Sequence, residues 1–240
     1  MPASERSRGR APIGDKVAAQ ALPLARDCLT AAAALTALPL RRPDPRSPEL
    51  ARSSLFFPLL GLLIGSVLLA VNALIAWHLS GPAAALCLVV VWAAIGRDWS
   101  GGAATWPVVI FLAALKWWCL WRSPAMHTAA FLFAPLLGRW SMVVLATGAR
   151  DADNPGRKFN PGIRFREFAL TSVITAGVLM TLAQFLGIVV FVAVAAVVLA
   201  ARLAVHRWLG GIRWSLLLIA SSTVELLVLW LLTLLAGGVA

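Results

Sequence analysis

Long uncharged runs constrain this chain more than any other feature. Residues 55–79 contain no Asp, Glu, Lys or Arg, and roughly 20 apolar residues are enough for a helix to cross the hydrocarbon core of a bilayer. Because lipid cannot hydrogen-bond the backbone, such a run is expected to be helical. The composition agrees, since 60% of the residues are hydrophobic and 13% are charged, whereas about a quarter of a soluble domain is charged. The sequence therefore predicts an all-α, polytopic integral membrane helical bundle.

The apolar runs predict about seven spans, counted by the length that a crossing helix needs. Besides 55–79, the runs near span length are 104–121, 127–147 and 216–236. The run 82–95 is short for a crossing, and the run 168–205 is too long for one helix. The segment "AQFLG", which contains Gln184 and Gly187, is the expected break and divides this long run into two crossings.

The N-terminal region is expected to lie outside these spans. Residues 1–20 are charged and carry Pro and Gly, so we expect a disordered cytoplasmic tail. Residues 22–40 form an apolar run that contains Arg26 and Asp27, which favours an interfacial or re-entrant helix over a full crossing. Residues 21–240 are expected to form a single membrane domain.

Basic residues are distributed unevenly between the predicted loops. With a cytoplasmic N-terminus, the cytoplasmic segments hold nine, one, five and two Lys and Arg residues; these segments are 1–54, 96–103, 148–167 and 206–215. The opposite segments hold only Arg122. Cytoplasmic loops carry the excess of Lys and Arg, so we expect a multi-pass protein of a bacterial-type cytoplasmic (inner) membrane, with N-terminus in and C-terminus out. The net charge of +11 is dispersed among apolar runs, which favours the lipid bilayer as partner and excludes nucleic acid.

Polar residues also lie at depth. Charge inside a membrane is costly and indicates either an ion pair or a function. Lys116 lies in the outer half of its run, where its side chain can extend to the interface. Arg139 and Glu225 lie near the middle of theirs, so we expect them to neutralise each other. Such a pair is equally compatible with a structural role and with a functional one.

The stretch "GRDWSGG" places Arg97 and Asp98 side by side between two apolar runs. From its residues alone it is either a turn between spans or part of a polar active-site loop. Asp151 and Asp153 alternate in the basic loop that follows the run 127–147, where solvated acids are expected. No histidine pair has the spacing of a metal site, and no nucleotide loop of the GxxxxGK[ST] type occurs.

Six segments of the chain carry a further signal through their order and spacing. They are "LTALPL" (35–40), "FFPLLGLLIG" (56–65), "GRDWSGG" with "LAALK" (96–116), "LGRWSM" (137–142), "NPGRKF" (154–159) and "RWLGGI" with "ASSTVELLVL" (207–229). Together, from about Leu22 to the C-terminus, they resemble the cobalamin synthase family, also called adenosylcobinamide-GDP ribazoletransferase. The second segment is the most specific.

The chain departs from the family pattern where acidic residues are expected. The family carries an acidic DGxADxxDG motif immediately before its [RK]DSRxG stretch, whereas here "VVVWAAI" runs directly into "GRDWSGG". Where the family has an arginine, a serine, an arginine and an aspartate, this chain has Ala37, Trp99, Ser100 and Ser215. By resemblance, the stretch at 97–102 is the far half of an active-site loop that lacks its acidic half.

The resemblance implies a reaction of late cobalamin biosynthesis. Adenosylcobinamide-GDP is joined to α-ribazole, or to its phosphate, and GMP is released, with carboxylates holding Mg²⁺ and with cations on the phosphates. It implies catalytic roles for Asp98, Arg97 and Arg139. It implies phosphate binding by Lys116, Arg150, Arg157, Lys158 and Gly102, and metal binding by Asp98 and Glu225. Because the acidic motif is missing, we expect weak turnover or none.

Two other functions stay open. The first is a catalytically degenerate relative that binds a corrinoid or organises other proteins of the pathway. The second is a small transporter or channel with Arg139 and Glu225 in a polar path, although the chain shows no internal repeat of the kind that many transporters have. A homo-oligomer is compatible with each of these functions.

Overall fold

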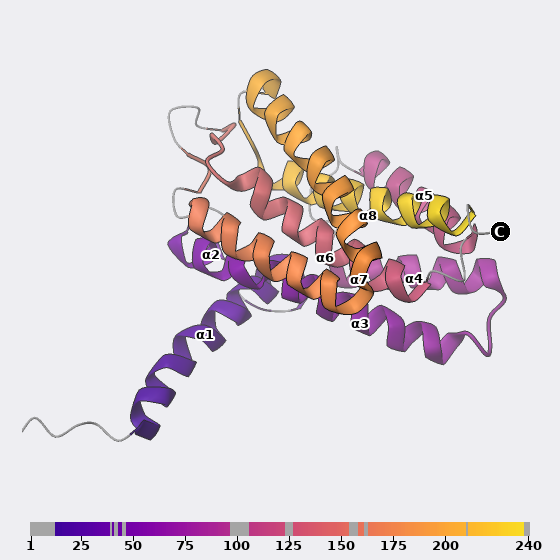
Figure 1. The fold of residues 1–240 in the computed structure, drawn as a ribbon, viewed down its shortest axis with the longest axis horizontal. Helices are drawn as coiled ribbons and strands as arrows, with labels where there is room; N and C mark the ends of the chain where they lie inside the picture. Colours follow the sequence, from indigo (N-terminus) through magenta and orange to yellow (C-terminus); the bar gives the residue numbers. More distant parts are fainter. Residues whose placement is uncertain are drawn as a thin grey trace, which may run out of the picture.

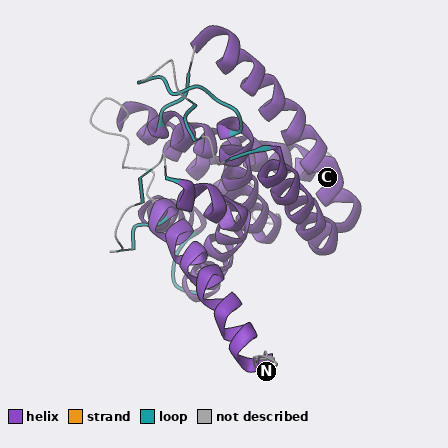
Figure 2. Ribbon diagram, turned by 90° about the vertical axis from the view of Figure 1, so that its left-hand side faces the viewer, coloured by secondary structure: helices purple, strands orange, loops and turns teal. Residues whose placement is uncertain are grey.

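The computed structural model describes residues 13–38, 40, 43–44, 47–96, 106–122, 127–153, 158–160, 163–209 and 211–237. These residues form helices joined by loops, with no strand among them (Figure 2). The helices are α1 (Ile13–Leu35), α2 (Pro48–Ser53), η1 (Ser54–Phe56), α3 (Phe57–Ile75), α4 (Gly81–Gly96), α5 (Trp106–Arg122), α6 (His127–Ala146), α7 (Phe165–Ala204), η5 (Val205–Leu209) and α8 (Trp214–Gly237). The predicted all-α membrane helical bundle is confirmed.

Helix α6 is the centre of the bundle (Figure 1). Every residue from Phe133 to Ala146 is buried, and α6 packs against α3, α7 and α8. Gly61 and Gly65 of α3 allow the closest of these approaches, because a Cβ atom on Gly61 would lie 2.8 Å from Leu136 Cα of α6. Small residues four apart are a common way to bring two membrane helices together. The pattern "GLLIG" is therefore a packing surface.

The break predicted in the longest apolar run is present. Gln184 has φ 47° and ψ −122°, which is outside any helical conformation, and α7 continues on both sides of it. Gly187 lies directly against the first arm, since a Cβ atom there would lie 2.7 Å from the Leu179 carbonyl carbon. In Figure 1, α7 accordingly consists of two orange arms that diverge from each other.

Helices α1 and α2 are joined by charged side chains. Arg26 of α1 forms an ion pair with Glu49 of α2 at 2.7 Å, and Asp27 of α1 lies 3.8 Å from Arg52 of α2. The charges inside the run 22–40 thus have partners on the neighbouring helix. Helix α1 begins at Ile13, inside the segment for which a disordered tail was expected, and it projects from the bundle in Figure 1.

Four helices in the described part of the chain are long and apolar enough to cross a membrane. They are Pro48–Ile75, His127–Ala146, Phe165–Trp208 and Trp214–Leu235. Helix α4 is apolar but shorter, as the sequence predicted. Seven crossings require that α4, α5 and both arms of α7 also span, so this number stays a prediction.

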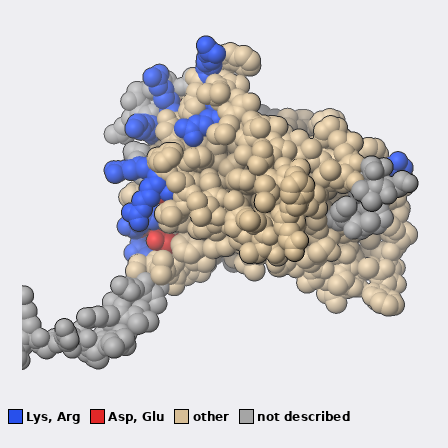
Figure 3. Space-filling view, viewed as in Figure 1, with Lys and Arg blue, Asp and Glu red and all other residues tan. Residues whose placement is uncertain are grey.

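Basic side chains gather at one end of the molecule. In Figure 3 they lie mainly on the left, which is the end where Figure 1 shows the loop between α6 and α7 and the start of α7. The long flank of the bundle shows no charged residue in this view. This is the charge distribution expected of a bundle with one basic face toward the cytoplasm.

Candidate functional site

A buried ion pair joins α5 and α8. Lys116 Nζ donates to Glu225 Oε2 at 2.5 Å, and the two residues are 3% and 0% exposed. The lysine therefore does not extend to the membrane interface. Removing one partner of a buried ion pair is strongly destabilising, because the attraction that offset the burial of the other charge is lost.

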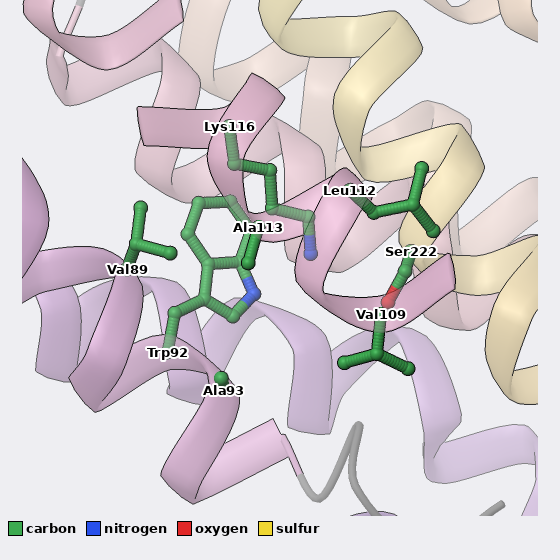
Figure 4. Close-up of a pocket in the computed structure, with 8 residues that line it drawn as sticks. All are labelled: Val89, Trp92, Ala93, Val109, Leu112, Ala113, Lys116 and Ser222. Atoms are coloured by element: carbon green, nitrogen blue, oxygen red, sulfur yellow. The ribbon is translucent and has the colours of Figure 1, made fainter. Parts of the chain in front are cut away.

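Trp92 of α4 completes the surroundings of Lys116. The ammonium group lies 4.9 Å from the centre of the Trp92 ring, a distance at which a cation is attracted by the aromatic face. Figure 4 shows the indole and the lysine side by side, with Ser222 of α8 opposite them. Three helices thus contribute to one polar cluster inside an apolar bundle.

Arg139 of α6 lies in the same buried centre. Its side chain is 0% exposed and donates to the Gly96 carbonyl at 3.1 Å and to Ser221 Oγ at 3.4 Å. Gly96 is the last residue of α4 and directly precedes Arg97. Arg139 therefore fixes the end of the helix that leads into the polar stretch.

The expected pairing of Arg139 with Glu225 stays a prediction. The ion pair that the structure shows for Glu225 is with Lys116, a partner that the sequence interpretation did not name. Gly138, beside Arg139 in α6, lies directly against this carboxylate, since a Cβ atom there would lie 2.6 Å from Glu225 Cγ. The glycine is what allows α8 to bring Glu225 into the centre.

The basic loop after α6 is held by its backbone. Arg150 forms an antiparallel bridge with Lys158, and Asp151 forms a parallel bridge with Ile212. The side chains of Arg150 and Lys158 are exposed, as phosphate contacts require. Asp151 is 1% exposed, so the expectation of a solvated acid was wrong for this residue. Its backbone pairs with Ile212, and its Oδ1 accepts a hydrogen bond from the Asp153 N–H group at 3.0 Å.

A groove of about 400 Å³ opens between this loop and the start of α8. Arg213 and Ser215 line it, and Arg213 forms an ion pair with Asp153 at 2.8 Å. Ser215 stands where the resembled family has an aspartate. The groove therefore includes one of the positions at which this chain departs from the family pattern.

Several predicted site residues lie outside the described residues. They are Arg97, Asp98, Gly102 and Arg157. Of the others, the structure brings Lys116, Arg139 and Glu225 into one buried centre, and it places Arg150 and Lys158 together in the basic loop.

The described side chains offer few ligands for Mg²⁺. Within the described part of the chain, no three His, Cys, Asp or Glu residues gather in a way that could hold a metal ion. Glu225 faces an ammonium group, and Asp153 faces Arg213. Mg²⁺ needs carboxylate oxygens directed at a hydrated ion, and the Glu225 carboxylate contacts Lys116 instead. Of the two predicted metal ligands, Asp98 is the one that lies outside the described residues.

Sequence reasoning missed Trp92, Ser221, Ser222 and Arg213. The position of Ser221 could have been predicted, because it precedes Glu225 by four residues and therefore lies on the same face of the helix. The role of Trp92 could not, since it depends on how α4 packs against α5. At 1% exposed, Trp92 lies inside the bundle and not on its surface.

Comparison with known proteins gives one match. No curated protein and no solved structure matches this chain. The profile of the family described as cobalamin-5-phosphate synthase (CobS) matches residues 27–97 and 94–233. The two matched pieces meet at 94–97, immediately before Asp98, where the acidic motif is missing from the sequence. Since the match covers far more than half of the chain, the protein belongs to the cobalamin-5-phosphate synthase family.

Proposed function

We propose that this protein acts in cobalamin synthesis as a membrane transferase that joins adenosylcobinamide-GDP to α-ribazole or its phosphate. The observation that carries the proposal is the family match over residues 27–97 and 94–233. In this reaction a ribazole hydroxyl attacks the cobinamide-side phosphorus of the pyrophosphate. A new P–O bond forms, the bond to the GMP phosphate breaks, and the hydroxyl proton is released.

The basic end of the bundle supplies what phosphoryl transfer needs. Such reactions depend on positioning and on cations near the phosphate charge. Arg150 and Lys158 are exposed there, and Arg213 lines the adjacent groove. We assign phosphate binding to these residues and, from the resemblance alone, also to Arg97 and Arg157, which lie outside the described residues.

Lys116 and Arg139 take a different role in this proposal from the one the resemblance implied. Both are buried, at 3% and 0% exposed, and both are directed at other parts of the bundle. We assign to Arg139 the positioning of the stretch 97–102 through the Gly96 carbonyl. We assign to Lys116 the neutralisation of Glu225.

The basic end is proposed to face the cytoplasm, where nucleotide-activated substrates are made available. The segregation of charge in Figure 3 supports this orientation, with the N-terminus inside and the C-terminus outside. Mg²⁺ is proposed to assist binding through Asp98 alone, and no step of the reaction is assigned to it.

A second candidate is a catalytically degenerate relative that binds the corrinoid nucleotide without turnover. Two observations favour it: the acidic motif is missing before Arg97, and Glu225 and Asp153 are engaged by cations. The two candidates share a binding site and differ in the product that they release.

The deciding experiment combines complementation with binding. The gene is expressed in a strain that lacks cobalamin synthase, and purified protein is titrated with adenosylcobinamide-GDP with and without Mg²⁺. We expect binding that Mg²⁺ tightens, and we expect Asp98→Asn to remove the tightening while leaving metal-independent binding. Asp15→Asn, at a position outside the matched segments, is the control.

Each result separates the candidates. Growth of the strain supports the transferase, and binding without growth supports the degenerate relative. Absence of binding contradicts both. Robust turnover that Asp98→Asn leaves unchanged would show that the site is not at the stretch 97–102.

A further inference from the structure

A small cavity lies beside the buried ion pair, where α4, α5 and α8 meet (Figure 4). Five of its lining residues are apolar, and the other three are Trp92, Lys116 and Ser222. Its volume is about 10 Å³. A cavity needs roughly 10–15 Å³ of this kind to hold one water molecule, so the space has the size of one water. A nucleotide or a lipid headgroup does not fit.

The indole of Trp92 supplies an independent reason for a ligand here. Its Nε1–H group is buried and has no hydrogen-bond partner among the residues that the structure describes, and the residue is 1% exposed. A buried N–H group without a partner is costly, and more so in a bundle surrounded by lipid. Buried tryptophans usually satisfy this group.

The polar atoms around the cavity converge. In Figure 4, Trp92 Nε1, Lys116 Nζ and Ser222 Oγ are directed toward the same space. Two of the three are obligatory donors, and the serine hydroxyl can accept. A water molecule can accept two hydrogen bonds and donate two, so one molecule matches this set.

We propose that the cavity is a binding site for one structural water molecule. The water accepts hydrogen bonds from Trp92 Nε1–H and from the Lys116 ammonium group, and it donates to Ser222 Oγ. It joins α4 to α5 and α8 and solvates an ammonium group that burial has removed from bulk water. Buried waters typically make about three such bonds. This inference does not depend on the reaction that the protein catalyses.

Radiolytic hydroxyl-radical labelling tests the proposal on the wild-type protein in detergent or nanodiscs. Radicals made from a bound water label the side chains beside it, even when bulk solvent does not reach them. Trp140 is the matched control, because it is 2% exposed and its Nε1–H group already donates to Ser172 Oγ at 3.0 Å. We expect Trp92 to be oxidised several-fold faster than Trp140. Equal rates would overturn the proposal.

The variant Ser222→Val adds a second arm. It removes the polar acceptor and fills the space with a methyl group, so we expect Trp92 labelling to fall to the rate of Trp140, whose own labelling stays unchanged. Fast labelling of Trp92 that persists in this variant would show that the radicals come from another source and would overturn the assignment of the water to this cavity. If the variant does not fold, the wild-type comparison still decides.

Discussion

At the scale of single residues, the buried centre of the bundle contains charged side chains that are stabilised by direct contact with each other. Lys116 and Glu225 are both inside, and their contact at 2.5 Å replaces the water that each charge has lost. Removing one partner of such a pair destabilises strongly, whereas replacing both by apolar residues is often neutral. Arg139 also needs polar contacts inside the bundle, because its guanidinium group stays charged in proteins.

A double-mutant cycle tests the ion pair. We expect Lys116→Met and Glu225→Leu each to destabilise the protein, by up to about 3–5 kcal/mol, because each removes one partner of a buried ion pair. The double variant is expected to lose much less than the sum. Thermal unfolding in detergent, followed by tryptophan fluorescence, provides the measurement. Additive losses would show that the two side chains do not stabilise each other.

Arg139→Ala tests the contact with the end of α4. Hydrogen bonds to charged groups contribute about 1.5–3 kcal/mol each, so we expect a loss of this order and a lower yield of folded protein. The control is Arg122→Ala, at the exposed end of α5, which is expected to stay within about 0.5 kcal/mol of wild type. Wild-type stability and ligand binding in Arg139→Ala would contradict both the structural and the positioning role.

At the scale of elements, close backbone contacts decide how the helices pack. Gly65 of α3 faces α6, and a Cβ atom there would lie 3.0 Å from the Phe131 carbonyl carbon. Gly177 of α7 offers a natural comparison, because nothing lies within 4 Å of the place its Cβ atom would occupy. The same residue type therefore serves packing in one helix and has no such role in the other.

The pair of variants Gly65→Ala and Gly177→Ala tests this contrast. We expect Gly65→Ala to destabilise the protein by about 1–3 kcal/mol through overpacking. Gly177→Ala is expected to be neutral or to stabilise by up to about 1 kcal/mol, since alanine is the better helix former. Unfolding temperatures measured side by side give the sign of each effect. A tolerated alanine at position 65 would show that α3 and α6 are not in close contact.

At the scale of the whole molecule, the arrangement of charge relates the bundle to the membrane. The loop between α6 and α7, the start of α7 and α2 lie at one end in Figure 1, and Figure 3 shows the basic side chains there. Cationic loops are retained in the cytoplasm, so the proposed orientation has this end on the cytoplasmic side.

Reporter fusions test the orientation. A reporter at the C-terminus is expected to be active only outside the cytoplasm, and one in the loop between α6 and α7 only inside it, because the basic segments stay on the cytoplasmic side. A C-terminal reporter active in the cytoplasm would contradict an odd number of crossings. The short helix α4 would then be the first to be removed from the count.

The sequence by itself determined the class of fold and much of the layout. The helices occupy the predicted apolar runs, the longest run breaks at Gln184, and the spacing of Gly61 and Gly65 marks a packing surface. These features follow from the sequence because a segment that crosses lipid must be an apolar helix of a certain length. Both the apolar length and the helical spacing can be read from the order of the residues.

Only the tertiary structure decided the partners of the buried charges. Lys116 and Glu225 are 109 residues apart, and their contact depends on which face of α5 turns toward α8. The burial of Asp151, whose backbone pairs with Ile212, is likewise visible only in the tertiary structure. Hydropathy places a residue at a depth in the membrane but does not set the rotation of its helix, and the rotation is fixed by the close packing of all the helices together.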